Sequence, residues 1–283
     1  MLQSPVKSQV EALFGEAKAS YTNDDFEIFH RFIAALNAGE IRSAEPDAAS
    51  HTGWRVNAWV KQGILLGFRM GTIVDMSLDA SKQPFFDKST YPVKRFSVSN
   101  AVRIVPGGSS VRTGAYVGKS VVCMPPMYIN VGAYVDEGTT VDSHALIGSC
   151  AQVGKKCHIS AGVQIGGVLE PVGALPVIVE DEVLAGGQSG IYEGVIVKRR
   201  AVLGTGTLLN ASTPVYDIVR DQILTATDSS PLIIPEGAVV VPGSRAITKP
   251  SAQKWGLGIY TPVIVKYRDE KTDSRIQLED LIR

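Results

Sequence analysis

Residues 105–167 read VPGGSSVRTGAYVGKSVVCMPPMYINVGAYVDEGTTVDSHALIGSCAQVGKKCHISAGVQIGG and repeat with a period of six. Eleven consecutive sixth positions hold an aliphatic residue or a cysteine: Val105, Val111, Val117, Cys123, Ile129, Val135, Val141, Ile147, Val153, Ile159 and Ile165. At 45% hydrophobic content, such a run would arise by chance about once in several thousand trials. The period is therefore a signal of the fold.

A six-residue period is typical of a parallel β-helix, in which each unit makes one short strand and one turn. Three units close a triangular coil, and successive coils stack about 4.8 Å apart. The aliphatic residue points into the narrow core. The residue four positions later is mostly small or medium-sized, as at Ala115, Ala133 and Ala145, and is also expected to be buried. The sequence thus predicts a mainly β protein.

The repeat breaks at residues 166–178, GGVLEPVGALPVI, and resumes in a shifted frame. The later aliphatic positions are Val179, Ala185, Ile191, Val197, Leu203 and Leu209. A second break covers roughly 212–231, after which Ile234 and Val240 restore the spacing. A break inside a strict repeat predicts a protruding loop, and such loops commonly carry function.

The flanks of the repeat have a different texture. Residues 5–38 are predicted to be helical up to a stop at Gly39, and 54–70 to form a second helix. Residues 71–100 are expected to be irregular with a strand, and 256–283 to hold a strand, YTPVIVKY, and a helical end, IQLEDLIR. We expect an N-terminal α/β domain at 1–102, a β-helix domain at 103–250 with loop 166–178, and a C-terminal extension at 251–283.

Charge and composition exclude several classes of protein. The 28 basic and 28 acidic residues balance, which argues against a broad nucleic-acid footprint. The N-terminus lacks a signal-peptide pattern and no apolar run approaches a membrane span, so no membrane partner is expected. Three cysteines, Cys123, Cys150 and Cys157, are too few for a disulfide framework. A reducing, cytoplasmic setting is expected.

Residues 118–171 resemble the tetrahydrodipicolinate N-succinyltransferases of the lysine–diaminopimelate pathway. The segments MYINVGAYVDEGT and GGVLEP are the most specific part of this likeness. WRVNAWVKQGILLGFRM at 54–70, FDK at 86–88, VRIVP at 102–106 and VIVKYRDEKT at 263–272 also resemble that family. The resemblance therefore extends over nearly the whole chain.

The resemblance implies a homotrimer of left-handed parallel β-helices, with a helical N-terminal domain, a short C-terminal extension and active sites between neighbouring subunits. It implies transfer of a succinyl group from succinyl-CoA to the amino group of the ring-opened tetrahydrodipicolinate. The co-substrate is then a coenzyme A thioester, succinyl-CoA or acetyl-CoA, and no metal is expected.

Four residues match functional positions of the family. Arg103, in VRIVP, matches the arginine with which the family binds a substrate carboxylate. A guanidinium fork suits that role. Asp142 matches a substrate-binding acid that would bind the nucleophilic amine and accept its proton as the catalytic base. Gly166 and Gly167 are expected to let the pantetheine arm of the cofactor approach the backbone. The structural alternatives are a surface arginine at a domain junction, a corner aspartate that binds backbone amides, and simple turn glycines.

Other polar residues are weaker candidates. His144 stands where the family commonly has tryptophan, and it lies two residues from Asp142, so both side chains are expected on one side of a strand. His158 precedes the inward Ile159 and is expected to be structural. Cys150 and Cys157 fall at repeat positions that require small side chains, which argues against a metal pair.

The chain departs from the family at residues 180–194, EDEVLAGGQSGIYEG. The family's arginine falls on Gln188 and its glutamate on Gly190. Loss of the arginine removes a natural partner for the distal carboxylate of a succinyl group, so an acetyl donor is an alternative. A specialised paralogue resembling the succinyltransferase-like protein of tabtoxin biosynthesis is one alternative. A catalytically impaired homologue that still binds ligand is another, and an amino-sugar acceptor is a weaker third.

Overall fold

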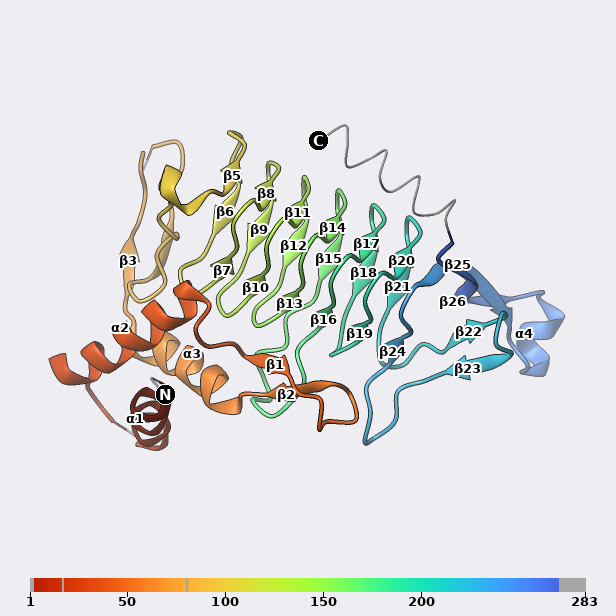
Figure 1. The fold of residues 1–283 in the computed structure, drawn as a ribbon, viewed down its shortest axis with the longest axis horizontal. Helices are drawn as coiled ribbons and strands as arrows, with labels where there is room; N and C mark the ends of the chain where they lie inside the picture. Colours follow the sequence, from red (N-terminus) through yellow and green to blue (C-terminus); the bar gives the residue numbers. More distant parts are fainter. Residues whose placement is uncertain (1–2, 17, 80, 270–283) are drawn as a thin grey trace.

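A coil of short parallel strands forms the centre of the computed structural model, which describes residues 3–16, 18–79 and 81–269 (Figure 1). From β5 to β21 each strand pairs with strands three elements away, so three strands make one turn of the coil, and β24 and β25 then pair with β19 and β20. Three sheets result. We name them the first, second and third sheets, in the order in which the chain visits them from β7 onward.

The first sheet contains β7 (Tyr116–Val117), β10 (Tyr134–Val135), β13 (Gln152–Val153), β16 (Ile178–Val179), β19 (Ile196–Val197) and β24 (Ile233–Ile234). The second contains β5 (Arg103–Ile104), β8 (Val122–Cys123), β11 (Thr140–Val141), β14 (His158–Ile159), β17 (Leu184–Ala185) and β20 (Val202–Leu203). The third contains β6 (Ser110–Val111), β9 (Tyr128–Ile129), β12 (Leu146–Ile147), β15 (Gln164–Ile165), β18 (Gly190–Ile191) and β21 (Leu208–Leu209).

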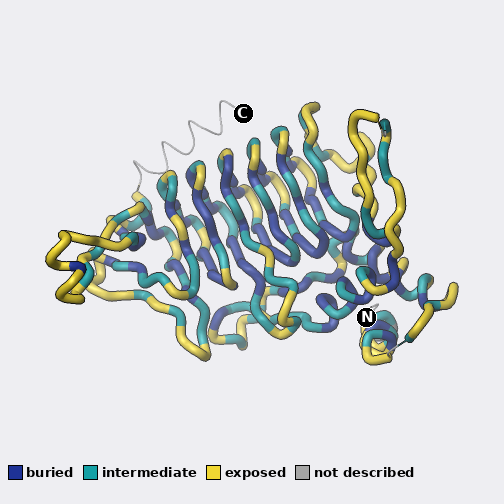
Figure 2. Tube along the Cα trace, turned by 180° about the vertical axis from the view of Figure 1, so that it is seen from behind, coloured by how far each residue is buried: buried dark blue, intermediate teal, exposed yellow. Residues whose placement is uncertain are grey.

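The core of the coil follows the six-residue period. The second residue of each two-residue strand from β6 onward points inward, and Ile129, Ile147 and Ile165 are fully buried. Buried stretches recur along the successive turns of the coil (Figure 2). The smaller residues four positions later, such as Ala115 and Ala133, are buried with them. The inward positions predicted after the first break are also confirmed, because Val179 to Leu209 keep the same register.

The start of the repeat differs from the prediction. Ile104 rather than Val105 pairs with the inward Cys123, so the first predicted position was wrong by one residue. Seven residues instead of six then separate Ile104 from Val111, and the extra length lies around Gly107 and Gly108, whose φ angles are +143° and +92°. Only glycine adopts such angles without strain.

The N-terminal part contains three helices, α1 (Gln3–Gly15), α2 (Asn23–Ala38) and α3 (Ala58–Met70). The single helical stretch predicted for 5–38 is therefore two helices, and the predicted helix 54–70 begins as a strand. A capping box of Thr22 and Asp25 starts α2, and Gly39 in the left-handed region ends it as predicted. The short elements are β1 (Ala44–Pro46), β2 (Trp54–Val56), β3 (Ile73–Asp75), β4 (Phe86–Lys88) and the 3₁₀ turn Val98–Asn100.

The N-terminal part covers the outer face of the first sheet. Ala44 and Trp54 pack on Ile178 and Ile196, which point outward from the coil. Gln152, also outward, is fully buried and bonds Ser43 Oγ at 2.9 Å. By contrast, the outer face of the third sheet carries half-buried Tyr128, Leu146 and Gln164 and the exposed Leu208.

The C-terminal part extends the second sheet beyond β20. Its strands follow in the order β25 (Ala238–Ala246), β26 (Gly258–Tyr267), β22 (Val215–Asp217) and β23 (Gln222–Leu224), and α4 (Pro250–Lys254) connects β25 to β26. The predicted strand at YTPVIVKY is confirmed as part of β26. The predicted helical end IQLEDLIR lies outside the described residues.

Candidate functional site

Asp142 occupies the corner between the second and third sheets. It directly follows β11, and its backbone amide bonds Ile159 O at 2.9 Å, which fixes it to the next coil. Its Oδ1 accepts a hydrogen bond from the Ser143 amide at 2.7 Å. The side chain is half-buried, and within the described residues Oδ2 has no hydrogen-bond partner. One carboxylate oxygen thus fixes the corner while the other can bind a ligand.

Arg103 lies on the same sheet as Asp142. In the register of the second sheet, Arg103 pairs with Val122 and Val122 pairs with Thr140, so Arg103 lies two strand spacings, about 10 Å, from the coil of Asp142. Arg103, Thr140 and Asp142 occupy outward positions. Arg103 is exposed and makes no ion pair among the described residues. The structure therefore places the two predicted substrate-binding residues on the outer face of one sheet.

Gly166 and Gly167 lie at a different corner, between the third and first sheets, where the loop of residues 166–177 leaves the coil. A side chain on Gly166 would come within 2.9 Å of the Tyr192 ring. One on Gly148, in the neighbouring coil, would come within 2.6 Å of the Gly167 backbone. These glycines permit close packing of backbone and ring. In one chain the third sheet separates them from Asp142.

The loop of residues 166–177 is attached to the N-terminal part through Lys61. Lys61 on α3 is fully buried, and its Nζ donates a hydrogen bond to Ala174 O at 2.5 Å. Burial lowers the pKa of Lys61 from its ordinary value. The backbone of the loop is also held to the coil by the bond from Val168 N to Ser149 O. Helix α3 therefore determines the position of the loop.

The departures from the family lie on the third sheet. Gln188 is exposed at a corner with a φ of +59°, and Gly190 is buried in β18. The ring of Tyr192 covers Gly190, since a Cβ there would lie 2.7 Å from Cζ and from the hydroxyl oxygen of Tyr192. Tyr192 was not among the residues predicted from the sequence. Its contact with position 190 could have been expected, because residues two apart on a strand have their side chains on the same side.

The histidines and cysteines have structural surroundings. His144 is exposed with a φ of +61°, and its amide bonds Pro126 O at 2.5 Å. His158 lies half-buried in β14. Burial raises the pKa of the Cys123, Cys150 and Cys157 thiols to about 12, which makes them poor nucleophiles and metal ligands at neutral pH.

Cys150 differs from its expected place. It sits at a left-handed corner, with a φ of +68°, and packs against the N-terminal helices instead of inside the coil. Among residues 3–16, 18–79 and 81–269, no three His, Cys, Asp or Glu side chains gather in a way that could hold a metal ion.

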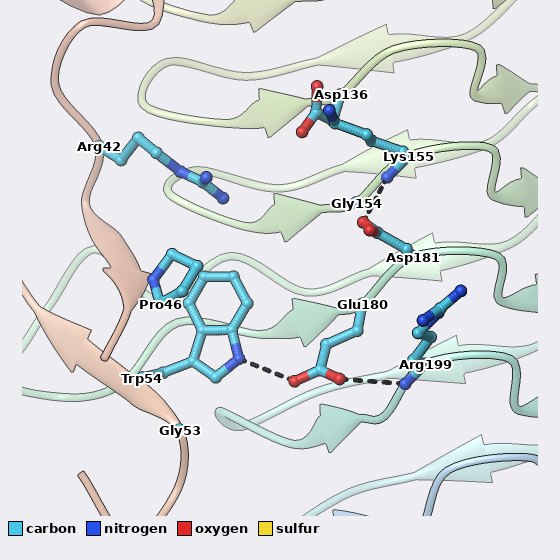
Figure 3. A pocket seen from close by; sticks show the side chains of 10 residues that line it. All are labelled: Arg42, Pro46, Gly53, Trp54, Asp136, Gly154, Lys155, Glu180, Asp181 and Arg199. Atoms are coloured by element: carbon cyan, nitrogen blue, oxygen red, sulfur yellow. Dashed lines mark hydrogen bonds between the residues drawn. The ribbon is translucent and has the colours of Figure 1, made fainter. Parts of the chain in front are cut away.

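A separate cavity of about 320 Å³ lies where the β1–β2 hairpin meets the corner between the first and second sheets (Figure 3). The guanidinium of Arg42 stacks 3.7 Å from the centroid of the Tyr134 ring, and its Nε donates to Gln152 Oε1 at 2.9 Å. Glu180 accepts hydrogen bonds from Trp54 Nε1, Lys198 Nζ and the Arg199 amide at 2.9–3.0 Å. These bonds attach the hairpin to the coil.

Comparisons with known proteins agree with the resemblance seen in the sequence. The family model described as Tetrahydrodipicolinate N-succinyltransferase N-terminal matches residues 5–70. A 2,3,4,5-tetrahydropyridine-2,6-dicarboxylate N-succinyltransferase of Rhodopseudomonas palustris is 42% identical over 290 aligned positions, covering 99% of this chain and 99% of the relative. The protein of the same name from Xylella fastidiosa strain Temecula1 is 42% identical, covering 90% of this chain and 87% of the relative.

A solved structure from Campylobacter jejuni shares the fold. It is described as a 2,3,4,5-tetrahydropyridine-2-carboxylate N-succinyltransferase, and it matches with a TM-score of 0.56 at 16% sequence identity. The match covers 84% of this chain and 62% of that chain. In the part of the chain that the structure describes, none of the helices is long and apolar enough to span a membrane.

Proposed function

Because this chain belongs to the tetrahydrodipicolinate N-succinyltransferase family, we propose that it is an acyl-CoA-dependent N-acyltransferase acting on tetrahydrodipicolinate or a close amino dicarboxylate. The expected donor is succinyl-CoA, and the expected context is lysine and diaminopimelate biosynthesis. The observation that carries this proposal is the position of Arg103 and Asp142, both outward on the second sheet. A cation for a carboxylate and a base for an amine lie there with backbones about 12 Å apart, two strand spacings across the sheet and two residues along it.

In the proposed reaction, Arg103 binds a carboxylate of the acceptor through its guanidinium fork. Asp142 binds the acceptor amine at Oδ2, the oxygen without a partner among the described residues. The amine nitrogen forms a bond to the thioester carbonyl carbon, Asp142 accepts the amine proton, and the carbon–sulfur bond breaks. The proton then reaches the departing sulfur, and coenzyme A leaves as the thiol. Backbone amides of the coil would stabilise the oxyanion, and the step needs no metal.

We also propose that the coil is left-handed and that the chain acts as a homotrimer with its sites between subunits. Gly166 and Gly167, assigned here to the pantetheine arm, lie at another corner than Asp142 in one chain. A neighbouring subunit can bring the two kinds of corner together, and two stiff walls would hold their geometry. The three-part division at residues 102 and 250 belongs to this proposal. So does a cytoplasmic location, which three unpaired buried cysteines support.

A shorter donor is the second candidate. Gln188 and Gly190 carry no charge, so they offer no partner for the distal carboxylate of a succinyl group. This favours acetyl-CoA in a specialised, tabtoxin-type paralogue. The third candidate is an impaired homologue that binds ligand without turnover.

Thiol release tests the proposal. Purified protein is mixed with tetrahydrodipicolinate and either succinyl-CoA or acetyl-CoA, and free coenzyme A is measured. We expect release that requires both the acceptor and a donor, and Arg103→Ala should raise the KM for the acceptor without changing the KM for the donor. No release with either donor would reject the acyltransferase and favour the impaired homologue. The ratio of the two donors' kcat/KM values decides between the first two candidates.

A further inference from the structure

Tyr192 occupies space on the outer face of the third sheet that a side chain at position 190 would otherwise take. Gly190 and Tyr192 are two residues apart across β18, so their side-chain positions share one side of the sheet. A Cβ built on Gly190 would lie 2.7 Å from Cζ and 2.7 Å from the hydroxyl oxygen of Tyr192. Real Cβ atoms essentially never come this close, so a side chain at 190 would require the ring to shift from this position.

A second glycine holds the ring from the neighbouring coil. β15 pairs with β18 so that Ile165 lies beside Ile191, which places Gly166 beside Tyr192. The amide of Gly166 bonds Ile191 O at 2.8 Å, and a Cβ on Gly166 would lie 2.9 Å from Cδ1 of the ring. Gly166 and Gly190 therefore form a cradle that admits the ring only because both lack side chains.

The outward strand positions of the third sheet beside the ring are uncharged. The outward residues of the third sheet are Ser110, Tyr128, Leu146, Gln164, Gly190 and Leu208. Leu208 pairs with Gly190 and is 41% exposed, so the ring lies beside an open apolar side chain. Within the described residues the Tyr192 hydroxyl makes no hydrogen bond, and the ring is half-buried. A ligand can therefore reach both.

We infer that Tyr192 is a specificity-determining residue that limits the acyl end of the cleft and disfavours long, charged acyl groups relative to short, uncharged ones. The inference rests on the proposed function, in which the thioester arm passes from Gly166 and Gly167 toward the Asp142 corner of a neighbouring subunit. The ring lies at the start of that path and takes up volume. The uncharged wall around it offers no cation to a second carboxylate.

The test compares two donors on one preparation of each variant. The kcat/KM values for succinyl-CoA and acetyl-CoA are measured with the same acceptor for the native protein, Tyr192→Ala and Tyr192→Phe. Because both donors are assayed on the same sample, the ratio does not depend on the folded fraction. One methylene in a pocket commonly changes kcat/KM by about 10–200-fold. We expect Tyr192→Ala to raise the succinyl-to-acetyl ratio at least about tenfold, and Tyr192→Phe to leave it within about twofold.

Tyr128→Ala is the matched control. Tyr128 is another outward tyrosine of the third sheet, three strands away from β18, so its removal changes the same chemistry elsewhere on the same face. The donor ratio should stay unchanged in this variant. An equal change in Tyr128→Ala and Tyr192→Ala would overturn the specific role of Tyr192.

Gly190→Ala perturbs the same place from the other side. Its methyl group must displace the ring, so this variant should shift the donor ratio, whereas adding it to Tyr192→Ala should not shift the ratio further. If the effects of Gly190→Ala and Tyr192→Ala simply added in the double variant, the two positions would not be in contact and the cradle would be refuted. An unchanged ratio in Tyr192→Ala, with normal thiol release in the native protein, would overturn the inference and leave the proposed function standing. No thiol release from either donor would overturn the proposed function, and the inference with it.

Discussion

The first and third sheets are built on the same repeat and the same buried core, yet their outer faces differ. Outward positions of the first sheet hold Ile178, Ile196 and Gln152, and the hairpin β1–β2 covers them. The third sheet is bare, uncharged and bordered by the two candidate corners. The inward residues determine the coil, whereas the outward residues determine which face packs against the N-terminal part and which face stays uncovered.

We expect the largest loss of stability from a substitution at Gly148, where the backbones of two coils pack closely at the edge of the third sheet. A Cβ on Gly148 would lie 2.6 Å from the Cα of Gly167, and backbone there cannot move without disturbing two coils. We expect Gly148→Ala to cost more than about 4 kcal/mol of unfolding free energy, measured by urea denaturation. Gly173→Ala is the control, since no atom lies within 4 Å of its Cβ position, and it should change stability by less than about 0.5 kcal/mol. Equal urea midpoints for the two variants would refute this account.

The chemical asymmetry of the corners can be tested with two aspartates in the same local geometry. Asp142 and Asp136 each follow a strand and accept a hydrogen bond from the next amide, at 2.7 and 2.8 Å. Asp142→Asn should lower kcat by about 10²–10⁴-fold because the base is lost, with little change in stability. Asp136→Asn keeps the same corner chemistry and should retain nearly full activity. If both variants lose activity equally, Asp142 has no special role.

Two outward glutamines compare the faces directly. Gln152 on the first sheet is fully buried and bonds Ser43 Oγ, Cys150 O and Arg42. Gln152→Leu removes these bonds, although Ser43 Oγ still donates to Cys150 O, and should cost about 2–3 kcal/mol of unfolding free energy. Gln164 on the third sheet is half-buried, and its bonds to two carbonyls are 3.2–3.3 Å long. Gln164→Leu should cost less than about 1 kcal/mol, because water replaces its bonds. Equal losses would mean that the faces do not differ in this respect.

The smallest effect concerns pH and the attachment of α2 to the coil. Lys94 Nζ donates to Asn37 Oδ1 at 2.7 Å and to Ala115 O at 2.8 Å, and burial lowers the pKa of Lys94 to about 8 from 10.5. Between these values the unfolded chain binds a proton that the folded chain lacks, so the contribution of Lys94 to stability rises with pH. Melting curves at pH 7.5 and 9.5 should show that the unfolding free energy of the native protein rises relative to that of Lys94→Met as the pH rises. The rise should be at most about 1.4 kcal/mol per pH unit. If the native protein instead became more stable relative to Lys94→Met as the pH falls, the predicted direction would be wrong.

The coil was predictable because its core is one-dimensional. Each inward residue from Val111 to Ile165 contacts the same layer of the neighbouring coil, so a period of six in the sequence is a period in space. The same logic fails at Val105, where an end coil has a neighbour on one side only and tolerates an extra residue. It also fails at residues 54–56, which pair with β1 as a strand although their composition fits a helix.

The candidate site was predictable only in part. Arg103 and Asp142 were assigned by resemblance, and the spacing of the coil places them on the outer face of one sheet. The position of Tyr192 depended on which side the ring turns, and this is decided by two glycines in different coils, Gly166 and Gly190. A contact between coils across a 26-residue separation, as between Gln164 and Gly190, cannot be read from a repeat that the loop has interrupted.

The two end strands of the third sheet, β6 and β21, are covered by other parts of the chain. This cover bears on how the molecule avoids forming fibres. At one end the Tyr260 hydroxyl binds both the amide and the carbonyl of Leu208, at 2.6 and 3.1 Å. At the other end Lys94 N and Pro92 O bond Val111 O and Thr113 N beside β6. Exposed strand edges are templates for further chains. With both terminal strands covered, the third sheet offers no open edge on which a second molecule could extend it into a filament.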